Sequence, residues 1–206
     1  MNLVKHGTFA AALLLSASAM ADTNGYFVGG AWGQTTADFN RSATLKANHG
    51  EVKFDRILRG KRTLMARAGL ELDQDSDFGP GRFYLSYDNV SNDRHGWYLR
   101  QENLLLSWDA RVAIGETTSL FGGLSAGLTR MELNPTGLRK DTTYGFAGGV
   151  QAGLLQELPN NFQLEGGIRF LVHNDSVRVR DRDLGGQGDA RLKQSRLAYV
   201  GVNYRF

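Results

Sequence analysis

Hydrophobic and polar residues alternate along most of this chain, and the alternation is clearest between residues 63 and 73. Apolar side chains at every second position in this segment predict a β-strand with one apolar and one polar face. The same pattern recurs seven more times. The predicted strands cover residues 25–34, 63–73, 82–90, 97–112, 119–133, 142–157, 162–174 and 195–206.

The connections between these segments alternate in length. The links 74–81, 113–118 and 158–161 are short and rich in turn-forming residues such as glycine, proline and asparagine. The links 35–62 and 175–194 are long. Short turns at one end and longer loops at the other are typical of transmembrane β-barrels. The sequence therefore predicts an all-β fold, an eight-stranded antiparallel up-and-down transmembrane β-barrel.

The N-terminus predicts secretion. Lys5 and His6 precede an apolar run at residues 9–15, and Ala19-Met20-Ala21 has the small-residue pattern of a signal-peptide cleavage site. The run is about half of the ~20 residues that a membrane-spanning helix needs. We therefore expect residues 1–21 to be a cleaved signal peptide and residues 22–206 to form the barrel.

The composition is compatible with a membrane barrel. The chain has 206 residues, of which 41% are hydrophobic, and a mean hydropathy of −0.34. Such a low average fits a barrel because only alternate residues face lipid. Cysteine is absent, which excludes disulfides and thiolate metal sites.

The two faces of the predicted strands carry different side chains. The apolar face is expected to contact lipid, and the other face is expected to fill the interior with ion pairs, because eight strands enclose only enough space for side chains. A narrow channel for small solutes is the alternative. Side chains expected inside are Arg67, Glu71, Arg82, Asp88, Glu102, Asp109, Arg111, Glu165, Arg169 and Arg205. Aromatic residues expected at the membrane interfaces are Trp32, Trp97, Tyr144, Phe162, Tyr204 and Phe206.

The last predicted strand alternates apolar residues up to Tyr204 and a final Phe206, and the first, at residues 25–33, is rich in glycine and aromatic residues. These two segments resemble the terminal strands of the small OmpX, Ail and OmpA-type outer-membrane barrels. The resemblance implies a location in the outer membrane of a Gram-negative bacterium. It also implies recognition of Tyr204 and Phe206 by the barrel-assembly machinery, and a non-enzymatic role in adhesion or envelope stability.

The two long loops are basic, and we expect them to lie outside the cell. Arginine and lysine bind phosphate by charge-assisted hydrogen bonds, so these loops predict contact with lipopolysaccharide, or with a host or surface ligand, through residues 35–62 and 175–194. The candidate contact residues are Arg41, Lys46, Lys53, Arg56, Arg59, Arg178, Arg180, Arg182, Arg191 and Lys193.

A lipid A-modifying enzyme of the deacylase type is the alternative function, with His173 and Ser176 as the residues to test. A separation of three residues puts these side chains on opposite faces of a regular strand, which disfavours a catalytic pair. The remaining histidines lack ligand spacing, so we expect no metal and no cofactor. Secretion argues against nucleic-acid binding despite a pI of about 9.3.

Overall fold

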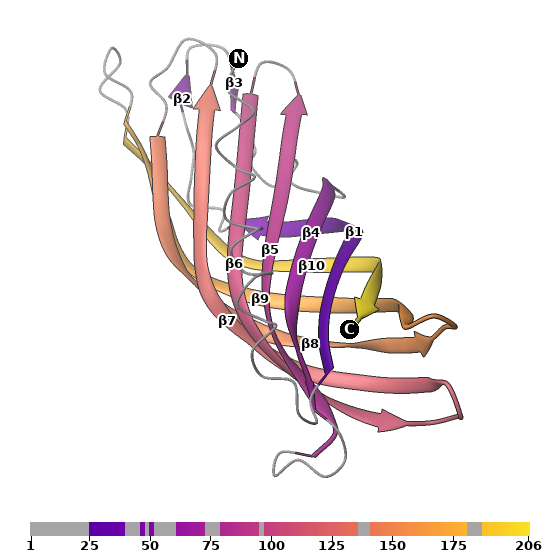
Figure 1. Ribbon diagram of the computed structural model, residues 1–206. Helices are drawn as coiled ribbons and strands as arrows, with labels where there is room; N and C mark the ends of the chain where they lie inside the picture. The colour runs from indigo at the N-terminus through magenta and orange to yellow at the C-terminus, as the bar shows by residue number, and fades with distance from the viewer. Residues whose placement is uncertain are drawn as a thin grey trace.

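Eight long antiparallel strands form a closed barrel in the computed structural model (Figure 1). The structure describes residues 25–39, 46–47, 50–51, 61–72, 79–94, 97–135, 141–180 and 187–206. A separate two-stranded sheet consists of β2 (Lys46–Ala47) and β3 (Gly50–Glu51). The barrel strands are β1 (Gly25–Phe39), β4 (Lys61–Leu72), β5 (Gly81–Arg94), β6 (Trp97–Ala113), β7 (Thr118–Pro135), β8 (Asp141–Glu157), β9 (Phe162–Arg180) and β10 (Gln187–Arg205). The predicted fold class is confirmed.

Closure comes from β1, which pairs antiparallel with β4 on one edge and with β10 on the other. The ladders are staggered. A row of paired residues that starts at Tyr26 passes once around the barrel and returns to β1 at Thr36, ten positions further on. Such a stagger requires tilted strands, as in all closed barrels.

The end of the barrel that carries the short turns is called the inner end here, and the opposite end the outer end. At the inner end, Asn160 and Asn161 connect β8 to β9 with φ angles of 61° and 63°. Asparagine tolerates this left-handed conformation better than other side chains, and two such residues in succession suit the twist of a tight hairpin. The Leu158 N–H donates to the Phe162 carbonyl at 2.8 Å and closes this connection.

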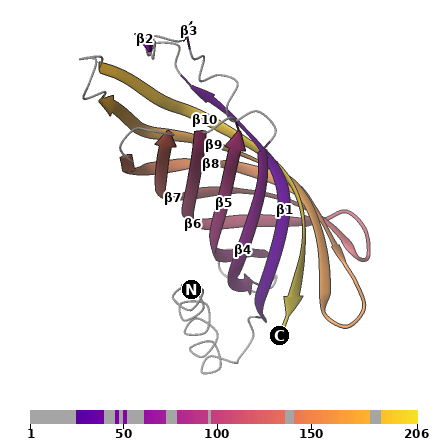
Figure 2. The ribbon, with the colours of Figure 1, turned by 90° about the horizontal axis from the view of Figure 1, so that it is seen from above.

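The strands extend further at the outer end than the sequence pattern predicted. β1 continues to Phe39, β9 continues to Arg180 and β10 begins at Gln187, so parts of the predicted loops 35–62 and 175–194 are strands. In Figure 2 the outer parts of β9 and β10 extend together at the upper left.

The outward face is apolar, as expected. Leucine, valine, isoleucine or aromatic side chains are exposed on every barrel strand, with Trp32 on β1 and Tyr87 on β5. Glu102 was wrongly expected inside. It shares the outward face with Leu104 and Leu106, whereas Gln101 and Asn103 are buried. In the described part of the chain, no helix is long and apolar enough to span a bilayer.

Candidate functional site

The centre of the barrel is filled by a buried ion-pair network around Arg82. Its guanidinium donates to Glu165 at 2.6 Å and to Asp109 at 2.9 and 3.0 Å, and all three side chains are fully buried. Arg67 binds the other Glu165 oxygen at 2.7 Å. Two cations thus share one carboxylate, which neutralises charges that would otherwise be costly to bury.

Aromatic rings surround the same guanidinium. The Arg82 Cζ atom lies 4.8 Å from the centroid of the Phe121 ring and 5.3 and 5.7 Å from those of Tyr84 and Phe27. Cation–π attraction is strongest where water is excluded. The rings and the two carboxylates therefore hold Arg82 across the lumen.

A second ion pair lies nearer the outer end. Arg169 donates to Asp88 at 2.9 Å and to the Gln151 side-chain oxygen at 2.7 Å. The Gln151 amide nitrogen in turn donates to Tyr84 and Asp109, which connects this pair to the Arg82 network.

Glu71 lies near the inner end and completes the interior charges. Gln163 donates to it at 2.8 Å, and Arg111 and Arg205 reach it at 3.4 and 3.5 Å from the partly exposed rim. Interior glycines make room for these long side chains. A Cβ atom at Gly201 would lie 2.7 Å from Arg67 Nη2. Ion-paired side chains therefore fill the lumen, as the sequence predicted.

A different set of charges faces outward near the outer end of β6 and β7. Glu102 accepts from Arg100 at 2.7 Å and from Arg130 at 3.2 Å, and Arg130 also reaches Glu132 at 3.4 Å. Tyr87 donates to Glu102. The Arg130 guanidinium lies 5.9 Å from the centroid of the Tyr144 ring. The two arginine side chains stay 34% and 40% exposed.

Two more outward arginines lie at a similar level. Arg62 on β4 and Ala198 on β10 both pair with Gln34 on β1, and Arg196 is two positions nearer the outer end than Ala198. Both arginine side chains are exposed, and Arg196 lies over the Phe170 ring. Arg62, Arg100, Arg130 and Arg196 are called the arginine belt below. Because strand pairing places these four residues at a similar level, the sequence pattern did not identify them.

The histidine of the predicted catalytic pair points into the barrel. His173 Nε2 and Ser195 Oγ are 2.8 Å apart, and both side chains are buried. The side chain of Ser176 lies outside the described residues. The pairing of β9 with β10 places Ser195 next to His173. No carboxylate is hydrogen-bonded to His173 Nδ1 in the described structure.

Five of the ten predicted loop contact residues lie on described strands. Arg41, Lys53, Arg56, Arg59 and Arg182 lie outside the described residues, as do residues 1–24 with the predicted signal peptide. Lys46 belongs to β2, Arg178 and Arg180 belong to β9, and Arg191 and Lys193 belong to β10. The described part of the chain contains no group of three or more histidine or acidic residues arranged for a metal ion.

Aromatic side chains are exposed at both ends of the wall, as predicted. Trp32 and Tyr144 lie toward the outer end, and Phe162, Tyr204 and Phe206 lie at the inner end. Tyr204 contacts both neighbouring rings edge-on, with centroid distances of 5.2 Å. The side chain of Trp97 is outside the described set. Recognition of Tyr204 and Phe206 by the assembly machinery stays a prediction.

A scan against family models matches residues 7–206 to the outer membrane protein beta-barrel domain. The chain belongs to this family. The protein is accordingly located in the cell outer membrane, as predicted. No match was found among curated proteins.

This chain is similar to solved structures of outer-membrane barrels. Outer membrane protein H (OprH) from P. aeruginosa is 38% identical, with 88% of this chain and 99% of that chain covered and a TM-score of 0.56. Neisserial surface protein A (NspA) has a TM-score of 0.59 at 14% identity, with 90% and 98% covered. The second likeness concerns the fold alone.

Proposed function

We propose that this protein stabilises the outer leaflet of the outer membrane by binding lipopolysaccharide phosphates, and that it catalyses no reaction. The observation that carries the proposal is the arginine belt. Its four cations face outward at the level where Trp32 and Tyr144 suggest the membrane interface. Guanidinium groups bind phosphate oxygens in a bidentate geometry that lysine cannot match.

Charge balance in the belt supports this proposal. The outward cluster on β6 and β7 contains Arg100 and Arg130 against Glu102 and Glu132. Arg62 and Arg196 add two more exposed cations to the belt, and Arg196 lies over the Phe170 ring. The basic residues of the predicted loops 35–62 and 175–194 add cations on the same side. Adhesion to a host or surface ligand through these loops stays a prediction.

The absence of catalysis is part of the proposal. His173 and Ser195 form a buried pair, and His173 Nδ1 has no carboxylate partner in the described structure, so the acid that would orient a catalytic histidine is missing there. The expected mass of lipid A is therefore the same in cells with and without the protein. Loss of one acyl chain in cells expressing the unmodified protein, but not the His173→Ala variant, would establish deacylation instead.

We further propose that the barrel does not conduct ions. The Arg82 network crosses the lumen and leaves Arg82, Glu165 and Asp109 fully buried. Planar bilayers containing the protein should show no stable open level. A reproducible unit conductance would favour the channel alternative.

Lipopolysaccharide binding to the purified protein in phosphatidylcholine vesicles tests the main proposal. Replacing all four belt arginines by glutamine should weaken binding and flatten its dependence on salt, because fewer phosphates are neutralised. Glu102→Gln together with Glu132→Gln is the matched control. It removes two carboxylates from the same surface and should strengthen binding. Unchanged binding by the belt variant would overturn the proposal.

A further inference from the structure

The barrel wall opens between β8 and β9 near the outer end. The β8–β9 ladder ends at the pair Ala147 and His173. Beyond this pair, β8 continues outward to Asp141 alongside β7, and β9 continues to Arg180 alongside β10. The two strands therefore diverge and form a fork, and the backbone groups on their facing edges have no strand partner across it.

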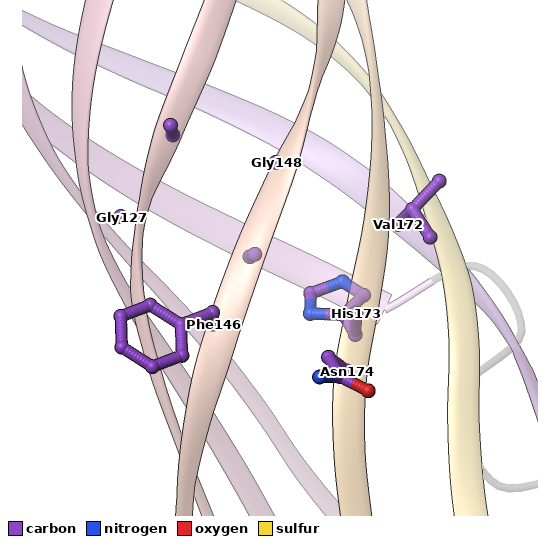
Figure 3. A pocket seen from close by; sticks show the side chains of 8 residues that line it. Gly127, Phe146, Gly148, Val172, His173 and Asn174 are labelled. Carbon is purple, nitrogen blue, oxygen red and sulfur yellow. The ribbon is translucent and has the colours of Figure 1, made fainter.

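A groove lies at the base of this fork. Its volume is about 610 Å³, and Ala126, Gly127, Phe146, Ala147, Gly148, Val172, His173 and Asn174 line it. Figure 3 shows the labelled residues on three neighbouring strands, with the His173 imidazole between β8 and β9. Phe146 and Val172 are 69% and 54% exposed, so the groove opens on the lipid-facing wall.

The floor of the groove lies below the surrounding surface because small residues are paired there. Ala126 on β7 pairs with Gly148 on β8. The rows on either side contain large side chains, with Leu124 opposite Val150 and Leu128 opposite Phe146. In the same row, Leu106 pairs with Ala126 and Val172 pairs with Gly148, so large side chains border the depression on every side. It is wide enough for a segment of one hydrocarbon chain.

A polar group is buried at the same place. His173 is only 4% exposed, and its Nδ1 atom has no hydrogen-bond partner. A buried polar atom without a partner costs about 1–3 kcal/mol, and backbone groups on a strand edge also need partners near the membrane. His173 Nδ1 therefore leaves one hydrogen-bonding position unmet beside the apolar groove, at the base of the fork.

We propose that the groove and fork together seat one acyl chain of a lipopolysaccharide molecule, an inference that rests on the proposed function. The chain lies across Ala126 and Gly148, between Phe146 and Val172. The amide and hydroxyl groups at the head of the lipid bond to the fork. In a bilayer there is no hydrophobic gain from this contact, so its strength comes from filling the depression and from the polar bonds.

Native mass spectrometry of the protein released from outer membranes into mild detergent at high salt tests this proposal. The unmodified protein should retain lipopolysaccharide. Gly148→Leu fills the groove and should lower the retained fraction severalfold. A Cβ atom at Gly148 has Ser125 O, at 3.8 Å, as its nearest neighbour, so this variant should fold.

Gly122→Leu is the matched control. Gly122 pairs with Ala152 on the same two strands nearer the inner end, and a Cβ atom there has its nearest neighbour at 4.0 Å. This variant should retain lipid like the unmodified protein. The heat-dependent electrophoretic shift of both variants should confirm that the barrel is closed.

The outcomes separate this proposal from the arginine belt. High salt screens the phosphate contacts of the belt but not an acyl chain, so the belt variant should still retain lipid under these conditions. Equal retention by Gly148→Leu and Gly122→Leu would overturn the groove proposal and leave the belt proposal intact. Retention of phospholipid alone, or a dimer that Gly148→Leu abolishes, would assign the groove to another occupant and also overturn it.

Discussion

Arginine and carboxylate side chains meet in two regions of this barrel, the lumen and the outer belt, under opposite conditions of hydration. In the lumen, Arg82 and Glu165 have no exposed side-chain surface. In the belt, the Arg130 side chain is 40% exposed beside Glu102. Buried charges are costly unless each has its partner, whereas exposed pairs are hydrated and contribute little. The same residue types therefore hold the fold in one region and remain available for ligands in the other.

Removing the shared carboxylate of the lumen should have the largest effect. Glu165→Gln leaves Arg82 and Arg67 without that charge, and breaking a buried pair in this way costs about 3–5 kcal/mol. Urea titration of the protein in micelles, followed by electrophoretic mobility without boiling, measures the loss. A change below 1 kcal/mol would mean that water already screens the lumen.

The Arg169 and Asp88 pair offers a smaller test of the same idea. Arg169→Met or Asp88→Leu alone should each destabilise the barrel by leaving one charge buried and unpaired. The double variant should be less destabilised than the sum of the two, because no charge then remains uncompensated. A double-mutant cycle of unfolding free energies measures the coupling, and strict additivity would contradict it.

The belt should give the smallest effect on stability. Arg130→Gln should change the unfolding free energy by about 0–1 kcal/mol, as exposed pairs do. It should nevertheless weaken lipopolysaccharide binding measurably. A stability loss as large as that of Glu165→Gln would show that the belt is structural, and the contrast between the two regions would fail.

Much of the fold could be predicted from period-two alternation, because lipid on one side and a polar lumen on the other impose it along each strand. Glu102 was misassigned for a physical reason. Leu104 and Leu106 face outward, and continuing their alternation places Glu102 outward as well. The prediction followed the charge of Glu102 instead, but Arg100 and Arg130 pair with that charge on the outer face.

The sites were less predictable because they depend on register between strands. His173 meets Ser195 because Ser195 pairs with Leu171, two residues from His173 on the same face of β9, and no local pattern reveals which residues of β10 lie opposite. The outer extension of β9 has the alternating sequence Val177-Arg178-Val179-Arg180. The prediction placed this segment in a loop, but a strand that extends beyond the membrane can carry such charges.

Pairing of β1 with β10 has a consequence for the speed of folding. This ladder joins residues as far apart as Phe27 and Arg205, and bringing such distant segments together has a high entropic cost before any contact compensates it. The other neighbouring strands of the barrel are much closer in sequence and can meet sooner. Closure is therefore expected to be the slow, late event, and until it occurs the edges of β1 and β10 remain open to pairing with other chains.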